Sequence, residues 1–340
     1  MIGIRADANE CIATGHIVRC MSIAAQLIKQ GEQVIFILAD LYAVELLERN
    51  GYEYVCLNID WKEKEKELDA MSKVIKDWNI SILLLDSYQV TLQYMNDLKK
   101  LVKIAYIDDL RAFEYTSDII INYALNAENQ WYDYARKNGT DMLLGAEYVP
   151  LRDEFRGKRL TIRRAVQDVL ITTGGTDSLH VCNAIASRMM QEKMFLDMKL
   201  HIVVGPFFEA VEELNQLASI YENIVLHKKV TRISDIMLGC DIAISAGGST
   251  LNELCALGIP TICFAIADNQ VPGVEVYQTK QLMVSVGDIR KNKGYIDQII
   301  LCVEKMCQDI DIRIGFSERQ KQVIDGKGVE RIAQRLMRLI

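Results

Sequence analysis

The chain has 340 residues, half of them hydrophobic and a quarter charged, with a formal net charge of -7 and a pI near 5.3. This length predicts two globular domains of about 150 residues each, and the acidic balance excludes the basic surface that a nucleic-acid partner requires. An anionic small molecule remains compatible with it, because helix N-termini bind phosphate without net positive charge.

No apolar run approaches the roughly 18 residues that span a bilayer, so we expect no membrane insertion. The opening residues MIGIRAD lack the basic flank and apolar stretch of a signal peptide, which predicts a cytoplasmic protein. The nine cysteines are odd in number and include no C-x-x-C pair, which indicates buried thiols in a reducing compartment. They are Cys11, Cys20, Cys56, Cys182, Cys240, Cys255, Cys263, Cys302 and Cys307.

Short apolar runs alternate with amphipathic stretches along the first half of the chain. Between the first two runs, Ile17, Met21, Ala24 and Ile28 recur with helical spacing, and Gly31 ends the helix. Alternating strands and helices predict a parallel sheet covered on both faces. The expected strands are 2–6, 34–39, 54–57, 80–85, 103–107 and 119–122.

A basic stretch at 156–164 interrupts this alternation, and we interpret it as an interdomain linker, with a solvated helix face as the alternative. Strands are then expected at 168–172, 200–204, 223–226, 241–245, 261–265 and 282–286. We predict a Rossmann-like domain at 1–157 and another at 158–315, with a crevice between the carboxyl ends of their strands. Residues 316–340 are helical in pattern and are expected to pack back on the first domain.

His16 follows Thr14 and Gly15 at the first turn of the first helix, where an open α/β sheet presents its active-site residues. The partial positive charge of a helix N-terminus disfavours imidazolium, so a neutral His16 could accept a proton near pH 7. The alternative is a histidine that only hydrogen-bonds a loop.

Two glycine-rich loops lie between strand and helix in the second half: T-T-G-G-T-D at 172–177 and S-A-G-G-S-T-L-N-E at 245–253. Adjacent glycines expose backbone N–H groups at a helix start, and two such loops suit a diphosphate. The loop at 172–177 is not a Walker A loop, and a tight turn without a ligand is its alternative. Glu253 could accept from two ribose hydroxyls or form a capping box with Thr250.

The polar cluster A-D-N-Q at 267–270 follows a strand and suits sugar hydroxyls or amides, with plain loop solvation as the alternative. His180, His201 and His227 show no metal-ligand spacing. The pair Asp108-Asp109 is not the D-x-D that holds a divalent ion beneath a nucleotide-sugar diphosphate. We therefore expect no essential metal and no cofactor.

Taken together, these motifs resemble the UDP-2,4-diacetamido-2,4,6-trideoxy-β-L-altropyranose hydrolase family of pseudaminic acid biosynthesis. The resemblance rests on R-A-D-x-N at 5–9, G-H-x-x-R-C at 15–20, Y-V-P-L-R-D-E-F at 148–155, G-G-T-D at 174–177, S-A-G-G-S-T-x-x-E at 245–253 and I-D-G-K-G-V-E-R at 324–331. Spore-coat polysaccharide proteins share the pattern, and the second half also resembles the glycosyltransferase that makes lipid II.

The resemblance implies a GT-B fold, with UDP bound by the C-terminal domain and the sugar between the domains. It implies that His16 is catalytic and that Glu253 binds the ribose. The implied diphosphate contacts are Gly174, Gly175, Thr176, Gly247, Gly248, Ser249 and Thr250. The implied sugar contacts are Asp7, Gly15, Tyr88, Arg152, Asn269 and Gln270. The family commonly carries I-G-x-G-H, whereas this chain has Ala13 at the first glycine, so we expect a locally different loop.

We therefore expect a hydrolase in which water, deprotonated by His16, attacks the anomeric carbon and inverts it while UDP leaves. The resemblance implies that the free product is 2,4-diacetamido-2,4,6-trideoxy-L-altrose, used for nonulosonic acid synthesis. One alternative is a GT-B glycosyltransferase that uses a UDP-amino sugar in surface or spore-coat polysaccharide synthesis, for which no apolar or basic acceptor patch is obvious. A non-catalytic nucleotide-sugar-binding protein is the other, which the presence of His16 disfavours.

Overall fold

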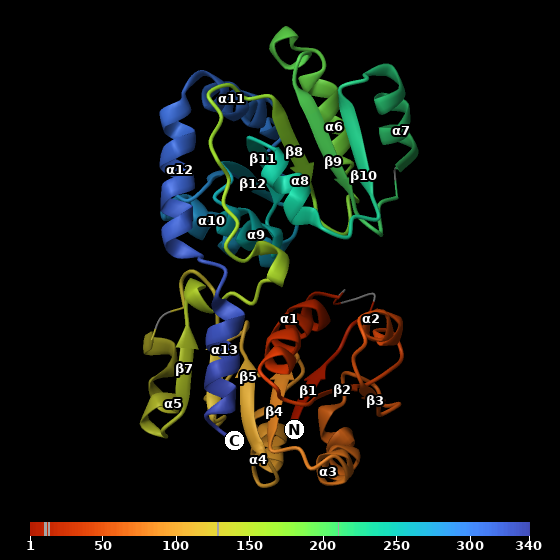
Figure 1. Ribbon diagram of the computed structural model, residues 1–340, viewed down its shortest axis with the longest axis vertical. Helices are drawn as coiled ribbons and strands as arrows, with labels where there is room; N and C mark the ends of the chain where they lie inside the picture. Colours follow the sequence, from red (N-terminus) through yellow and green to blue (C-terminus); the bar gives the residue numbers. More distant parts are fainter. Residues whose placement is uncertain (10–11, 13, 128, 210) are drawn as a thin grey trace. The chain divides into compact units, whose positions relative to one another are not determined.

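The computed structural model describes residues 1–9, 12, 14–127, 129–209 and 211–340, and it divides into two compact units (Figure 1). Unit 1 comprises Met1–Asp153 and Gly326–Ile340, and unit 2 comprises Glu154–Asp325. Cys11 and Ala13 lie outside the described residues, and the cysteines within them are unpaired. None of the helices in these ranges is both long and apolar enough to cross a membrane.

Unit 1 contains a seven-stranded parallel sheet with the strand order β3-β2-β1-β4-β5-β6-β7. Its strands are β1 (Ile2–Ala6), β2 (Val34–Leu38), β3 (Tyr54–Cys56), β4 (Ile82–Asp86), β5 (Lys103–Ile107), β6 (Ile119–Asn122) and β7 (Asp141–Leu144). The apolar runs predicted the first six. β7 was not predicted, because this edge strand is only partly buried and its apolar run, residues 142–144, is short.

Helices cover both faces of this sheet. They are α1 (Gly15–Lys29), α2 (Val44–Arg49), α3 (Leu68–Asp77), α4 (Leu92–Lys99), α5 (Asp133–Lys137) and α13 (Gly328–Met337), with 3₁₀ turns η1 (Lys64–Glu67), η2 (Asn129–Tyr132) and η3 (Ala146–Tyr148). Successive strand residues point to opposite faces, so Phe36 packs in the core beside α1 whereas Ile35 packs in the core beside α3 and α4.

The last helix, α13, packs against α1 within unit 1 (Figure 1). The side chains that it adds to the core are Val329, Ile332, Ala333 and Leu336. Gly328 opens the helix, and a Cβ there would lie 2.1 Å from the carbonyl oxygen of Val149, so a larger residue cannot fit. The segment that returns to unit 1 begins at Gly326 and not at 316, because α12 (Ile310–Val323) packs on α9 (Thr250–Leu257) of unit 2.

Unit 2 contains a six-stranded parallel sheet with the strand order β10-β9-β8-β11-β12-β13. Its strands are β8 (Asp168–Thr172), β9 (Lys199–Val204), β10 (Ile224–Lys228), β11 (Ile242–Ala246), β12 (Thr261–Ala265) and β13 (Val284–Asp288). The helices besides α9 and α12 are α6 (Val181–Met189), α7 (Val211–Ile220), α8 (Ile233–Gly239), α10 (Val271–Thr279) and α11 (Tyr295–Gln308), with 3₁₀ turns η5 (Lys193–Phe195) and η6 (Asp268–Gln270). The predicted α/β class with two parallel sheets is therefore confirmed.

The basic stretch 156–164, interpreted as a linker, packs on unit 2. The buried guanidinium of Arg313 donates to the carbonyl oxygens of Arg163 and Arg164, both at 2.8 Å. The Arg163 side chain pairs with the buried carboxylate of Asp241 at 2.6 Å. These contacts fix the stretch, and the crossing from unit 1 lies before it, after Asp153.

Candidate active site

His16 lies in the first turn of α1, after the loop that leaves the carboxyl end of β1. The residue is only 4% exposed. Gly15 opens the helix, and a Cβ at that position would meet no described atom within 4 Å. The start of α1 therefore has open space beside a buried imidazole.

A carboxylate at the end of β4 holds the His16 ring. Nδ1 of His16 lies 2.6 Å from Oδ1 of Asp86. Burial alone would raise the pKa of Asp86, but the charge of Arg19 and the hydrogen bonds from Arg19 and His16 outweigh burial and lower it well below its usual range. Because an ionised carboxylate accepts only, the proton between the two atoms belongs to Nδ1. In the neutral ring, Nε2 then carries the lone pair, which is the tautomer that a general base requires.

Arg19, one turn along α1, links this pair to a second carboxylate. Its Nε donates to Oδ2 of Asp86 at 2.6 Å, and its Nη1 donates to Oδ2 of Asp109 at 2.8 Å. Nη1 also donates to the hydroxyl of Tyr123 at 2.5 Å. Nη2 lies 3.0 Å from Nδ1 of His16 but also donates to Asp86. A permanently charged guanidinium thus keeps Asp86 ionised.

Tyr88, a predicted sugar contact, lies against the same cluster. Its ring meets the His16 ring edge-on, with centroids 4.5 Å apart. The Tyr88 hydroxyl donates to Oδ2 of Asp109 at 3.3 Å, and burial together with that carboxylate raises the Tyr88 pKa to about 12. The side chain remains 42% exposed, so it can reach a ligand that approaches His16.

Asp7, also predicted to contact the sugar, lies instead in a buried ion cluster. Its carboxylate accepts from Arg5 Nη1 at 2.5 Å, from Lys64 Nζ at 2.9 Å and from the Ala39 amide at 3.0 Å. Arg5 also donates to both oxygens of Glu67, at 2.9 and 2.7 Å. With 3% of Asp7 exposed, the structure gives this residue a structural role: the cluster ties η1 to β1.

In unit 2, the loop Gly174–Thr176 follows β8, but no helix begins directly after it. α6 starts at Val181, and the Asp177 carboxylate accepts from the amides of Val181 and Cys182 at 2.8 and 3.0 Å. The expectation that this loop offers a free helix N-terminus is therefore wrong, because Asp177 already caps the helix.

Backbone geometry favours glycine at position 174, and close packing requires glycine at position 205. Gly174 has a φ of +87°, which favours glycine. Gly205 packs so closely that a Cβ on it would lie 2.3 Å from the carbonyl oxygen of Gly174. The amides of Gly175 and Thr176 donate to no protein atom in the described ranges. An anion at this loop would be held by those two amides.

The second loop leads directly into α9. Ser249 is the N-cap and makes no side-chain capping bond, and Thr250 is already the first helical residue. Thr250 therefore does not occupy the N-cap position that a capping box with Glu253 requires. Within the described chain, the amides of Ser249 and Thr250 have no protein acceptor, so this helix start presents donors and a positive dipole end.

The two glycines before this helix differ in what surrounds them. A Cβ on Gly247 would lie 2.6 Å from Cγ1 of Val274 on α10, so packing requires glycine there. A Cβ on Gly248 would meet no described atom within 4 Å, and its φ is not positive. Neither packing nor backbone geometry explains Gly248, which leaves room for an external group.

The remaining predicted sugar contacts of unit 2 lie close to this loop. Gln270 approaches Gly247, with its Cβ 3.2 Å from where a Cβ on that glycine would be. The Gln270 Oε1 accepts from the Ile266 amide at 2.9 Å, which leaves its NH₂ group for a ligand. Asn269 is exposed beside it.

Arg152 is the last of the predicted sugar contacts in unit 1. It lines a hollow of about 260 Å³ beside α1, together with Val18, Ser22 and Gln26. His16 and Tyr88 do not line this hollow. The role of Arg152 as a sugar contact therefore stays a prediction.

No three His, Cys, Asp or Glu side chains in the described ranges are grouped to hold a metal ion. His201 and His227 do meet, with Nδ1 of the former 2.9 Å from Nε2 of the latter, and His201 Nε2 lies 2.9 Å from Asp168. Burial and the neighbouring His201 lower the pKa of His227.

Three members of the His16 cluster were not predicted as site residues: Asp86, Arg19 and Asp109. Asp86 ends β4 and Asp109 comes shortly after β5, and both strands follow β1 in the sheet order. Polar residues at the carboxyl ends of neighbouring parallel strands meet at one edge. That rule could have drawn attention to both carboxylates.

The two units together have the GT-B fold, as predicted. The structure is similar to that of MurG from Acinetobacter baumannii, with a TM-score of 0.72, 12% identity and 99% of each chain covered. It is also similar to the calicheamicin glycosyltransferase CalG4, with a TM-score of 0.65, 13% identity and coverage of 99% of this chain and 98% of that one. At such identities the likeness concerns the fold alone.

The chain also has relatives that are recognisable by sequence. The chain is 22% identical over 342 residues to the spore coat polysaccharide biosynthesis protein SpsG of Bacillus subtilis, covering 97% of this chain and 96% of that protein. It is 24% identical over 264 residues to the UDP-2,4-diacetamido-2,4,6-trideoxy-β-L-altropyranose hydrolase of Campylobacter jejuni, covering 76% and 90%. An uncharacterised Methanocaldococcus jannaschii protein is 25% identical over 77% of this chain, which spans about half, 54%, of that protein. No family model matches. The homologues thus include both kinds of protein that the motifs resemble.

Proposed function

We propose that this protein hydrolyses a UDP-linked amino sugar, with His16 as the general base. The observation that carries the proposal is the 2.6 Å contact between His16 Nδ1 and Asp86, which leaves Nε2 free to accept a proton. The homologous Campylobacter hydrolase supports the choice of reaction. By that relationship the sugar is a 2,4-diacetamido-2,4,6-trideoxy altropyranose, and the free sugar serves nonulosonic acid synthesis.

In the proposed reaction, a water molecule gives its proton to His16 Nε2 while its oxygen forms a bond to the anomeric carbon. The bond from that carbon to the diphosphate oxygen breaks on the opposite face, so the anomeric centre inverts and UDP leaves with the electron pair. Asp86 stabilises the imidazolium that forms, and Arg19 keeps Asp86 ionised. Tyr88 borders the sugar beside His16.

UDP is assigned to the loops of unit 2. The amides of Ser249 and Thr250 at the start of α9 are the main diphosphate donors, with those of Gly175 and Thr176 as a second set. Gly248 leaves room for the diphosphate to approach the backbone. Glu253, half-buried in α9, is assigned to the ribose hydroxyls.

The sugar contacts in this proposal are Gly15 and Tyr88 in unit 1 and Asn269 and Gln270 in unit 2. Asp7 is withdrawn because its oxygens are taken by Arg5 and Lys64. We assign no metal to the reaction, since we propose that the backbone amide donors stabilise the negative charge of the diphosphate.

Glycosyl transfer is the second candidate function. The alignment with SpsG covers nearly the whole of both chains, and a polysaccharide pathway is consistent with a glycosyltransferase. In that case His16 would deprotonate an acceptor hydroxyl in place of water, with the same arrangement of Asp86 and UDP.

The test is UDP release from a panel of UDP-amino sugars in water without any acceptor, with and without a chelator. Hydrolysis predicts stoichiometric UDP and free sugar at a rate that the chelator does not change. UDP binding without release, which becomes turnover only when a carbohydrate acceptor is added, would contradict hydrolysis and favour transfer.

A further inference from the structure

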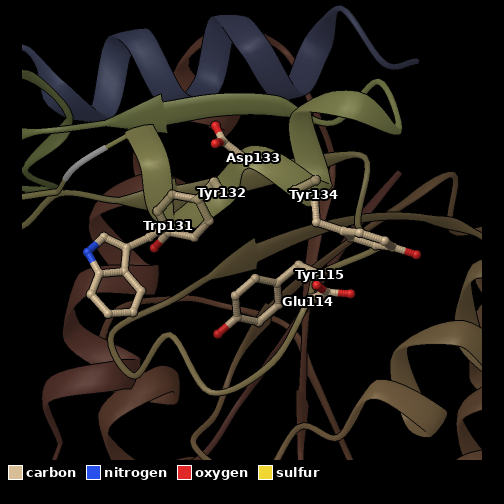
Figure 2. Close-up of a pocket in the computed structure, with 7 residues that line it drawn as sticks. Glu114, Tyr115, Trp131, Tyr132, Asp133 and Tyr134 are labelled. Atoms are coloured by element: carbon tan, nitrogen blue, oxygen red, sulfur yellow. The ribbon is translucent and has the colours of Figure 1, made fainter.

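An aromatic pocket of about 180 Å³ in unit 1 lies outside the residues assigned to hydrolysis (Figure 2). Its lining comes from two segments, the loop after β5 and the η2–α5 segment after β6. The labelled residues are Glu114, Tyr115, Trp131, Tyr132, Asp133 and Tyr134. Both segments follow the carboxyl ends of strands, as do His16 and Asp86.

The floor of the pocket is held rigidly. Tyr115 and Tyr132 are buried, and their hydroxyls donate to the two oxygens of the fully buried Asp108, each at 2.7 Å. Asn122 Nδ2 donates to the Tyr132 hydroxyl at 2.7 Å. The two rings lie 6.2 Å apart, centroid to centroid. Such a network fixes the rings before any ligand arrives, which lowers the entropy cost of binding.

The rim of the pocket exposes large aromatic side chains. Trp131 is 60% exposed and Tyr134 is 44% exposed. Figure 2 shows Trp131 on one side of Tyr132 and Tyr115, and Tyr134 on the other side. Grouped exposed aromatic surface of this kind marks a binding site more often than scattered exposed residues do.

Negative and positive side chains around the rim of the pocket balance one another. The lining supplies two carboxylates, Glu114 and Asp133. The Arg111 guanidinium lies over the Trp131 ring at 5.4 Å, and Arg136 Nη1 lies 3.8 Å from Asp133 Oδ1. A charged ligand would lose hydration here without gaining a dedicated counter-charge. An uncharged ligand with apolar faces and hydroxyl groups matches both the rings and the carboxylate acceptors.

We propose that this pocket binds an uncharged sugar ring, at a subsite separate from the UDP-binding loops of unit 2. The C–H faces of the sugar pack on the exposed rings of Trp131 and Tyr134, and its hydroxyls donate to Glu114 and Asp133. The volume equals the liquid share of about six water molecules at ~30 Å³ each, which suits a single ring. Asp108 anchors the pocket floor and its neighbour Asp109 bonds Arg19, so one loop serves both this subsite and the His16 cluster.

The experiment titrates the full chain with N-acetylglucosamine and with glucose, and follows saturation-transfer NMR of the sugar. We expect saturable binding in the millimolar range and no displacement by saturating UDP. Trp131→Ala should weaken binding about tenfold, and Glu114→Gln should weaken it less. Trp61→Ala is the matched control, because Trp61 also stacks with a cation, Lys62, at 5.5 Å, and it should change nothing.

Several results would overturn the proposal. These are no saturable binding of either neutral sugar up to about 100 mM, unchanged binding in Trp131→Ala, or displacement of the sugar by UDP. Tighter binding of glucosamine than of N-acetylglucosamine would show that the pocket selects an ammonium group. Trp131 is mostly exposed, so circular dichroism should show Trp131→Ala to be folded. None of these results depends on turnover, so failure here is distinguishable from failure of the hydrolase proposal.

Discussion

The glycine pair before α9 allows packing and ligand binding to be separated by two single-methyl substitutions. Gly247→Ala places a methyl 2.6 Å from Val274 Cγ1 and 3.3 Å from the carbonyl oxygen of Phe264. Gly248→Ala places the same methyl where no described atom lies within 4 Å. The two variants are therefore matched in chemistry and differ in surroundings.

The expected magnitudes follow from these distances. Overpacking of this kind costs about 1–3 kcal/mol, and at ~2–4 °C per kcal/mol Gly247→Ala should unfold roughly 2–12 °C lower than the native protein. Gly248→Ala should be as stable as the native protein or gain up to about 1 kcal/mol. Its methyl intrudes on the proposed diphosphate position, and loss of one charge-assisted hydrogen bond, about 1.5–3 kcal/mol, weakens UDP by ~10–100-fold.

Thermal unfolding and calorimetric titration with UDP, run on both variants, measure the two effects independently. Native UDP affinity in Gly248→Ala would contradict the placement of the diphosphate at this helix start. Destabilisation of Gly248→Ala as large as that of Gly247→Ala would show that the space around residue 248 is occupied.

Three further predictions concern single side chains. Asp86→Asn should lower turnover by about 10²–10⁴-fold with UDP affinity unchanged, because an amide no longer holds the proton on His16 Nδ1. The low pKa of Asp86 also stabilises the folded protein above the usual pKa of an aspartate, and this stabilisation is lost on acidification. The stability of Asp86→Asn should therefore depend less on pH below ~4 than that of the native protein. Glu253→Ala should weaken UDP more than 2′-deoxy-UDP, and equal weakening in calorimetry would refute ribose binding. Lys64→Met should destabilise the protein by about 3–5 kcal/mol in urea unfolding, because it leaves the buried Asp7 cluster short of a cation; native stability would contradict the structural role of the cluster.

Much of the fold is predictable from the sequence because its signals are local. The apolar run Ile119–Asn122 predicts a buried strand wherever it lies in the sheet. The prediction of a linker at 156–164 was wrong, because the residues that hold this stretch on unit 2 are distant in sequence. Arg313 donates to its carbonyl oxygens, and Asp241 pairs with Arg163. Basic composition without apolar periodicity is typical of a linker, and only the tertiary contacts distinguish the two cases.

The residues of the site also divide into those that a local sequence pattern predicts and those that only tertiary contacts reveal. The position of His16 is predictable because the loop after the first strand of a parallel sheet lies at the carboxyl edge of that sheet. Its partner Asp86 lies 70 residues further along the chain, and no local pattern connects the two. Asp7 was assigned to the sugar because it shares a motif with His16, whereas its ion-pair partner Lys64 lies 57 residues away.

The central claim is tested most directly by following UDP release from the UDP-linked diacetamido-trideoxy sugar in water labelled with heavy oxygen, for the native protein and for His16→Asn. Attack at the anomeric carbon predicts that the released UDP contains no label, and that His16→Asn releases it about 10²–10⁴-fold more slowly. Labelled UDP would show attack at phosphorus, and a native rate in His16→Asn would remove the general base; either result would contradict the account.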